Sequence, residues 1–224
     1  MASQLNIISR SLPFAVYILF LATSDYLAIP LSTLGIDEKW LYAIKISVVT
    51  SLIIYFWHHY SELRVKPEIK HFLYAVIAGT LVFLAWILPY PTWALLGKDT
   101  ATFNPTQGQN EVVVVMWLSI RLFGASLIAP VMEELFWRSF IMRWIDNKSF
   151  LSLPPEKVTT YALLASSCLF ALEHQLWIAG LFAGLIYAWL YKSYKNLWIP
   201  IFAHAVTNGL LGVWVVYTGN WQYW

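Results

Sequence analysis

The side chains best suited to chemistry are ionisable and amide groups placed in otherwise apolar stretches. The segment EELFWRSF (133–140) sets two adjacent carboxylates and an arginine among leucine, tryptophan and phenylalanine. Farther along, FALEH contributes Glu173 and His174, and HAVTN contributes His204 and Asn208. Ionisable residues in membrane-type helices are costly and indicate a functional site by default. Carboxylates and imidazoles can transfer protons as acids and bases, and an amide can donate hydrogen bonds to developing negative charge.

Helical spacing predicts different positions for the two adjacent glutamates. Glu134 and Arg138 are four residues apart, in the order that favours an ion pair on one helix face. Glu133 is turned by about 100° from its neighbour and is expected to point into a cavity. His204 and Asn208 also share one face of their helix. A cluster of charges at the membrane boundary would explain the glutamates alone, but three segments with complementary polar groups favour a site.

These segments belong to a chain with the composition of a membrane protein. Of its 224 residues, 59% are hydrophobic and 12% are charged, whereas soluble domains have roughly 25% charged residues. The apolar segments approach the length of about 20 residues that a helix needs to cross a bilayer. The sequence therefore predicts an all-α, polytopic membrane bundle of about seven, possibly eight, transmembrane helices. We expect helices over residues 11–34, 40–58, 72–90, 111–145, 158–173, 176–193 and 197–218.

The expected organisation is one membrane domain, residues 1–224, because no repeat or hydrophilic domain interrupts the apolar segments. Residues 111–218 would form the motif-bearing catalytic core, and residues 1–110 the N-terminal helices. The polar stretch 98–111 is interpreted as an external loop. Lys and Arg residues fall mostly on alternate connections, and short cytoplasmic loops collect such residues. This pattern predicts a cytoplasmic N-terminus and an external C-terminus.

The ordered motifs EELFWR, FALEH and HAVTN resemble the signature of the CAAX-prenyl-protease and bacteriocin-processing family of intramembrane endopeptidases. They comprise two glutamates with an arginine four residues after the second, a phenylalanine with a histidine four on, and a histidine with an asparagine four on. The resemblance covers residues 133–208, and no such motif occurs in residues 1–110. The variant EELFWRSF also resembles prenyl-protease-related proteins that accompany exosortase-type sorting systems in Gram-negative bacteria.

The resemblance implies hydrolysis of a peptide bond near the terminus of a membrane-anchored protein, without a metal cofactor. In the family's mechanism, Glu133 activates a water with the help of His174. The oxyanion hole is expected to comprise His204 and Asn208, and the Glu134–Arg138 pair is expected to support the helix. The expected partners are a membrane-anchored protein or peptide substrate and the lipid bilayer, not nucleic acid. The expected location is the inner membrane of a bacterium.

Other functions are compatible with the same residues. Glu133, His174 and His204 form a legitimate three-ligand set for catalytic zinc, although the chain lacks the HExxH signature. A non-catalytic scaffold or chaperone of the same family would use the polar core to bind a partner. A transporter would be expected to show inverted repeats, which the sequence does not display. A prenylated tail, a bacteriocin-like leader and a sorting-signal protein would all approach the same cavity as substrates.

The remaining ionisable and reactive residues have structural interpretations. Arg121 is expected to pair with Asp25 or Glu173, with contact to a substrate carboxylate as the alternative. Lys45 is expected to extend to the membrane interface. Cys168, the single cysteine, is expected to fill space inside the bundle.

The catalytic interpretation places one demand on the fold. Simple topology puts Glu133 near the cytoplasmic end of its helix and His174 near the external end of another. The two side chains can meet only if the turn around EHQLW (173–177) ends inside the membrane, where irregular backbone is tolerated beside a water-filled cavity.

Overall fold

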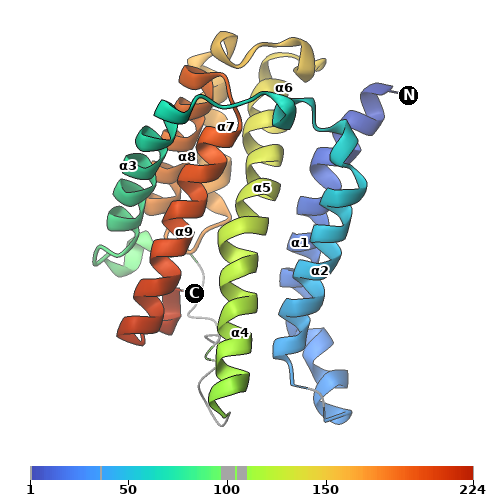
Figure 1. Cartoon of the computed structure of the whole chain (residues 1–224), viewed down its shortest axis with the longest axis vertical. Helices are drawn as coiled ribbons and strands as arrows, with labels where there is room; N and C mark the ends of the chain where they lie inside the picture. The colour runs from blue at the N-terminus through green and yellow to red at the C-terminus, as the bar shows by residue number, and fades with distance from the viewer. Residues whose placement is uncertain (1, 36, 97–103, 105–109, 224) are drawn as a thin grey trace.

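The structure is a computed structural model that describes residues 2–35, 37–96, 104 and 110–223. It is a bundle of helices with a long central rod (Figure 1). Over the described ranges no β-strand forms, and the prediction of an all-α membrane bundle is confirmed. The helices are α1 (Ala2–Thr33), α2 (Lys39–Tyr55), α3 (Ile69–Trp86), α4 (Glu111–Phe123), α5 (Ala129–Glu134), α6 (Met142–Asp146), α7 (Thr160–Leu172), α8 (Trp177–Tyr194) and α9 (Trp198–Thr218).

The central rod consists of α4, α5 and α6 and runs without a break from Glu111 to Asp146. Two π-helical segments, η4 (Gly124–Ile128) and η5 (Leu135–Ile141), join the three α-helical parts. Pro130 lacks a backbone N–H and would break a regular α-helix, and the first π segment ends two residues before it, at Ile128. Such π segments occur often at functional sites. The short α5 helix that carries the two adjacent glutamates is therefore set between two local departures from α-helical geometry.

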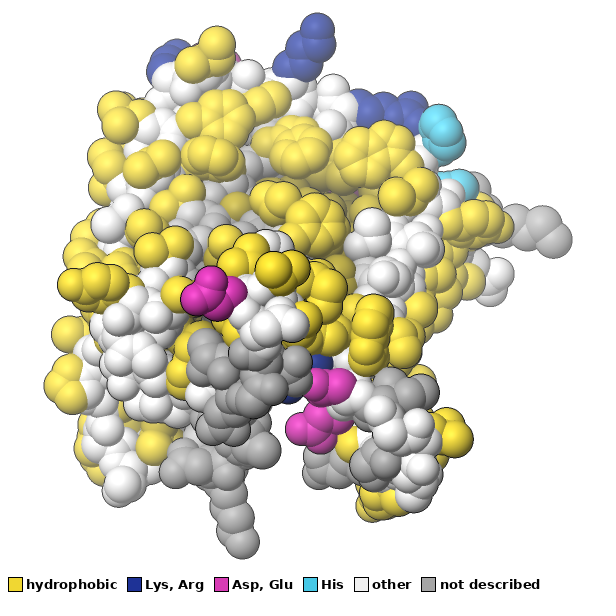
Figure 2. All heavy atoms as spheres, turned by 60° about the horizontal axis from the view of Figure 1, so that its bottom comes forward, with side chains coloured by type: hydrophobic (Ala, Val, Ile, Leu, Met, Phe, Trp, Pro, Cys, Tyr) yellow, Lys and Arg dark blue, Asp and Glu magenta, His cyan; other side chains and the backbone are white. Residues whose placement is uncertain are grey.

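The described residues include four helices that are long and apolar enough to cross a membrane: Gln4–Ser24, Ile69–Trp86, Glu111–Asp146 and Trp198–Thr218. Hydrophobic side chains also cover much of the outer surface in Figure 2. The chain is therefore an integral membrane protein. The predicted spans 40–58 and 176–193 form helices α2 and α8 but are not among these four.

The connections rich in Lys and Arg lie at one end of the bundle. The N-terminus and the connections 56–68 and 147–159 share the upper end of Figure 1, and Lys and Arg side chains gather along the corresponding edge in Figure 2. The predicted external loop 98–111 falls largely on residues 97–103 and 105–109, which lie outside the described residues.

Helix α7 is too short to cross the membrane. Its 13 residues extend about 20 Å, because the rise is about 1.5 Å per residue, whereas the hydrocarbon core is about 30 Å thick. Its first turn is attached to the end of the rod, because the backbone N–H of Thr159 donates to Asp146 at 2.7 Å. The turn at 173–176 is consequently expected at a depth inside the membrane, as the catalytic interpretation demands. The backbone N–H of Leu96 donates to the carbonyl oxygen of Gln175 in this turn at 2.8 Å.

Helices α3 and α9 pack closely at Gly79. A Cβ atom at this position would overlap the backbone carbonyl oxygen of Ala203 and lie 2.9 Å from Cβ of Val206. The hydroxyl group of Thr207 also donates to the carbonyl oxygen of Gly79 at 2.8 Å. The absence of a side chain therefore lets α9 approach α3 closely enough for a direct hydrogen bond.

Replacing Gly79 with alanine should destabilise the bundle. Because backbone atoms must move to admit the methyl group, we expect a loss of about 1–3 kcal/mol, typical of overpacking. Gly209→Ala, on α9, is the matched control, because its Cβ would meet only Ser126 Oγ at 3.8 Å. That change should stabilise the helix by up to about 1 kcal/mol. Unfolding midpoints in detergent measure both effects, and equal midpoints for the two variants would contradict the packing argument.

A buried charge cluster joins α1, the connection 61–64 and the rod. Arg10 donates from Nε to Glu62 Oε1 at 2.8 Å and from Nη2 to Oε2 at 2.6 Å. Ser139 donates to the same carboxylate, and Arg143 Nη2 lies 3.6 Å from its Oε1. All four side chains are buried. Burial alone would raise the pKa of Glu62, but hydrogen bonds and charge from Arg10 hold this pKa below its ordinary value.

Two predictions about single residues are wrong. Lys45 does not extend to the interface, because it is only 5% exposed and its Nζ lies 4.1 Å from the ring centroid of Tyr17. The aromatic rings of α1 and α2 offer the ammonium group a favourable buried position. Cys168 does not fill internal space, because it lies exposed on the surface of α7.

Candidate active site

A cavity of about 250 Å³ lies between the rod and the helices around it. The predicted catalytic residues Glu133, His174, His204 and Asn208 all line this cavity. They come from α5, from the turn after α7 and from α9. The structure thus brings together polar groups that are up to 75 residues apart in the sequence, counted from 133 to 208. The other lining residues are Tyr17, Trp86, Arg121, Ala125, Phe170, Ala183, Tyr187, Thr207, Leu211 and Tyr223.

Glu133 lies on the cavity side of α5, and its side chain is 13% exposed. Its Oε2 atom is buried and accepts no hydrogen bond from the described residues. The closest cationic candidate is Nε2 of His204, at 3.9 Å, beyond hydrogen-bonding distance. A buried carboxylate oxygen without a donor is costly and is available to bind a water or a substrate proton.

Glu134 faces away from the cavity and is fully buried. Its Oε2 lies 3.1 Å from Nε of Arg138, so the predicted i,i+4 ion pair forms. The guanidinium carbon of Arg138 in turn lies 4.3 Å from the ring centroid of Phe170 on α7. The pair therefore connects the rod to α7 and orients the α5 helix.

His174 has a defined hydrogen-bonding arrangement. Its Nδ1 lies 2.8 Å from the carbonyl oxygen of Phe170, and a carbonyl only accepts hydrogen bonds, so Nδ1 carries a proton. In the neutral ring, Nε2 is then an acceptor. This nitrogen can hold a water molecule through one of its protons or coordinate a metal ion.

His204 and Asn208 lie on the same face of α9, as the spacing predicts. Nδ1 of His204 contacts Glu134 Oε1 at 3.0 Å, and its ring stacks on Tyr187 with centroids 4.9 Å apart. One N–H of the Asn208 amide donates to the carbonyl oxygen of Ala125 at 2.8 Å. An asparagine amide has a second N–H, which remains for a ligand in the cavity. The contact of His204 with Glu134 was not foreseen, because it depends on how α9 packs against the rod.

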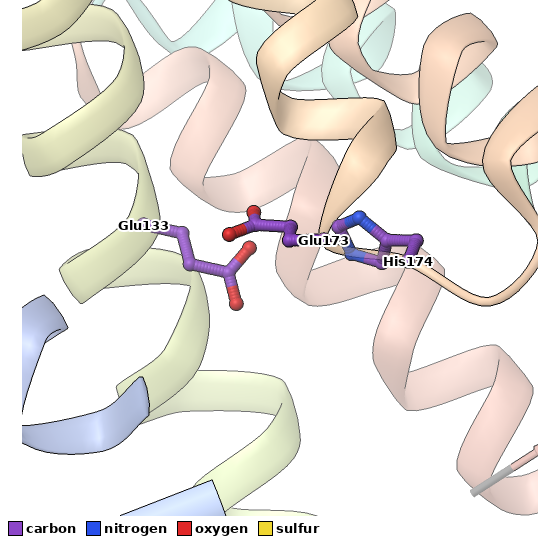
Figure 3. Close-up of side chains that lie close together, drawn as sticks. All are labelled: Glu133, Glu173 and His174. Atoms are coloured by element: carbon purple, nitrogen blue, oxygen red, sulfur yellow. The ribbon is translucent and has the colours of Figure 1, made fainter. Parts of the chain in front are cut away.

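Glu173 was not predicted as a site residue. One ligand atom each from Glu133, Glu173 and His174 lies within 4.8 Å of the other two, and Figure 3 shows the two carboxylates facing each other across the site. Trp137 holds Glu173 by donating from Nε1 to Oε1 at 2.8 Å. The position of Glu173 next to His174 in an apolar segment could have indicated a site residue. The sequence interpretation instead treated Glu173 as a structural partner for Arg121.

These contacts also define the most compact donor set for a metal within the part of the chain that the structure describes. That set is Glu133, Glu173 and His174, whereas the zinc set considered from the sequence used His204 as the third ligand. Two carboxylates and one imidazole are a legitimate combination for a divalent cation. In this structure His204 is instead bound to Glu134.

Arg121 lines the cavity on the side of α4. Its guanidinium carbon lies 4.5 Å from the ring centroid of Tyr42, an arrangement typical of a cation–π contact. The side chain of Asp25, one of its two predicted partners, lies outside the described residues. Glu173, the other, is bound to Trp137.

The apolar helix bundle is that of an integral membrane protein, and the acid/base groups around its internal cavity form a candidate active site. Residues 115–210 match the family described as Rce1-like, type II CAAX prenyl endopeptidase Rce1-like. This region of the chain is therefore similar to the CAAX prenyl endopeptidases, in agreement with the resemblance of its motifs. The association with exosortase systems remains a hypothesis.

A curated relative supports the same assignment. The chain is 29% identical over 100 residues to "Putative membrane peptidase YdiL" of Bacillus subtilis (strain 168). This match covers 42% of the chain and 37% of the relative, so the chain spans little more than a third of that protein's length. No solved structure matches the chain.

Proposed function

We propose that the protein is a membrane-embedded endopeptidase that hydrolyses a peptide bond near the terminus of a membrane-anchored protein. The observation that carries this proposal is the convergence of Glu133, His174, His204 and Asn208 on one cavity inside an apolar bundle. The similarity to a membrane peptidase and to CAAX prenyl endopeptidases supports the same reaction class.

In the proposed reaction, Glu133 acts as the general base. Its free Oε2 takes a proton from a water molecule while the water oxygen attacks the scissile carbonyl carbon. Nε2 of His174 accepts the second proton of the water in a hydrogen bond and so fixes its orientation. A positioned base of this kind contributes typically about 10²–10⁴-fold to the rate.

The oxyanion that forms needs hydrogen-bond donors. The second N–H of Asn208 is one, because the first already binds Ala125. His204 is the other when its ring is protonated, since Nδ1 then donates to Glu134 at 3.0 Å and Nε2 carries the second proton. Preorganised donors of this type are usually the largest contribution to the stabilisation of a transition state.

The proposed membrane orientation follows from the charges. The end of the bundle that carries the Lys and Arg side chains (Figure 2) would face the cytoplasm, with the chain in a bacterial inner membrane. The turn at 173–176 lies below that end within the bundle (Figure 1). A substrate anchored in the same membrane would therefore meet the cavity within the lipid.

A metal-dependent version of the same reaction is the second candidate. It is favoured by one observation, the approach of Glu133, Glu173 and His174 to within 4.8 Å of one another. A bound divalent cation would activate water as a Lewis acid. Glu133 would then be a ligand rather than the base.

Cleavage by the purified protein in liposomes tests the proposal. The probes are a set of peptides anchored by a fatty acyl or prenyl chain, with products identified by mass spectrometry. We expect cleavage at one position near the peptide terminus, at the same rate with and without a chelator. Loss of cleavage with the chelator, restored by zinc, would support the metal-dependent version. Intact peptides throughout would favour a non-catalytic scaffold.

A further inference from the structure

The cavity has a positively charged end to which the proposed hydrolysis assigns no role. Arg121 and Tyr17 line the cavity together with the proposed catalytic residues, and Lys45 lies against Tyr17. We propose that Arg121 and Lys45 form a subsite that binds a carboxylate of the substrate. This inference rests on the proposed peptidase function and states which chemical group the cavity recognises besides the scissile bond.

Arg121 places a permanent positive charge on the wall of the cavity. It lies on α4, within the candidate span Glu111–Asp146, and a guanidinium group stays protonated in proteins. Ionisable side chains inside a span are costly and often mark the path of a substrate or ion. The guanidinium group also matches a carboxylate closely, because its N–H groups form a planar fork that can donate two parallel hydrogen bonds.

Lys45 adds a second cation at the same end of the cavity. Its Nζ lies 4.1 Å from the ring centroid of Tyr17 and 5.0 Å from that of Tyr42, and the guanidinium carbon of Arg121 lies 4.5 Å from the same Tyr42 centroid. Among the residues that the structure describes, aromatic rings rather than carboxylates surround the ammonium group. Two positive charges beside one ring repel each other where the dielectric constant is low, and a bound anion would relieve this repulsion.

The packing of α2 against the rod holds the two cations in place. The hydroxyl group of Tyr42 donates to the carbonyl oxygen of Arg121 at 3.1 Å. A Cβ atom at Gly124 would overlap this hydroxyl group and the side chain of Ile46, so α2 and the rod are in close contact here. Helix α1, which carries Tyr17, packs along α2 (Figure 1). Three helices therefore preorganise the subsite, which lowers the entropic cost of binding.

The position of the subsite along the rod limits where the carboxylate lies in the substrate. Arg121 precedes Glu133 by twelve residues, which corresponds to a rise of about 18 Å. An extended peptide advances about 3.3–3.6 Å per residue, so the carboxylate would lie about five residues or fewer from the scissile bond. A C-terminal carboxylate and the side chain of an acidic residue both offer the required group.

Binding of substrate analogues that resist cleavage tests the subsite without any turnover. The probes are fatty-acyl-anchored peptides in which a ketomethylene group replaces the scissile amide, with a series of lengths of up to about five residues beyond it. Each length is made with a free C-terminal carboxylate, as a neutral C-terminal amide, and as amides with one aspartate on either side of the ketomethylene group. In phosphatidylcholine liposomes, we expect at least one carboxylate-bearing peptide to bind about 10–100-fold more tightly than its neutral amide, as hydrogen bonds to charged groups contribute. The series that shows this gain identifies the source of the carboxylate.

Substitutions separate a carboxylate subsite from a structural role. Arg121→Gln should abolish the preference for the carboxylate peptide while leaving the affinity for the neutral amide unchanged. Arg121→Lys keeps the charge and should retain part of the preference, and Lys45→Gln should reduce it. Lys39→Gln is the matched control on the same helix, because Lys39 pairs with Asp37 at 3.0 Å and should not affect the preference.

The outcomes distinguish a failure of the subsite from a failure of the proposed function. Equal affinities of the wild type for the carboxylate and neutral peptides would overturn the subsite alone, and this comparison does not depend on the folding of any variant. An equal loss of carboxylate and amide binding in Arg121→Gln would also overturn it, because Arg121 would then act on the structure of the cavity. If no analogue binds and the parent peptides are not cleaved, the proposed function itself fails and the subsite fails with it.

Discussion

Glu133→Gln is expected to reduce kcat for peptide cleavage by about 10²–10⁴-fold, the contribution of a positioned general base. Glutamine has nearly the same size and shape, so the cavity and the fold should persist. Its amide cannot accept a proton from water, however, and the free Oε2 of the native carboxylate is lost. Initial rates with a lipid-anchored peptide, measured beside an unfolding curve for each protein, separate catalysis from stability.

Two comparisons make the Glu133 result interpretable. Glu111→Gln removes a carboxylate from the same rod at an exposed position and should cleave like the wild type. The unfolding midpoint of Glu133→Gln should equal or exceed the native value, because a buried carboxylate oxygen without a donor is removed. A Glu133→Gln variant that folds and still cleaves within a factor of about 10 of the native rate would exclude the base assignment.

Glu62→Ala is expected to give the largest loss of stability, about 3–5 kcal/mol, as is typical when one partner of a buried ion pair is removed. The change leaves the guanidinium groups of Arg10 and Arg143 buried without their shared carboxylate. It also removes the acceptor that connects α1 to the rod through Ser139. The measurement is the free energy of unfolding in detergent or lipid.

The same carboxylate predicts a dependence on pH. Because the pKa of Glu62 is lower in the folded protein than its ordinary value, its contribution to stability is complete above the ordinary pKa. That contribution is lost as the pH falls through the lower, folded value. Glu62→Gln should therefore flatten the acid side of the stability curve. Glu68→Ala, which breaks an exposed pair with Lys70, is the control and should leave the unfolding midpoint unchanged. An equal loss of stability in Glu62→Ala and Glu68→Ala would refute the argument.

The sequence predicts the helices well because the signal is local. Long apolar segments bounded by polar or proline-containing connections define α1, α3, the rod and α9 directly. The ion pair of Glu134 and Arg138 is local too, because it depends only on a spacing of four residues within one helix.

The site required information that the sequence contains only indirectly. That Glu133 and Glu173 face each other depends on where α7 ends inside the bundle, and on the indole N–H of Trp137 from another helix. The buried position of Lys45 depends on the ring of Tyr17 from α1. Likewise, Glu62 occurs in a polar connection, and its burial follows only from the approach of Arg10 and Ser139. Each of these contacts joins distant parts of the chain, so no periodicity or spacing indicates it.

The central claim is that Glu133 and His174, held on separate elements, act on one water molecule. A double-mutant cycle of peptide cleavage in liposomes tests it most directly, with Glu133→Gln, His174→Ala and the combined variant. Residues that act as a unit are strongly non-additive, so the double variant should be no slower than the slower single variant. Losses that multiply in the double variant would contradict the claim, because the two side chains would then contribute independently.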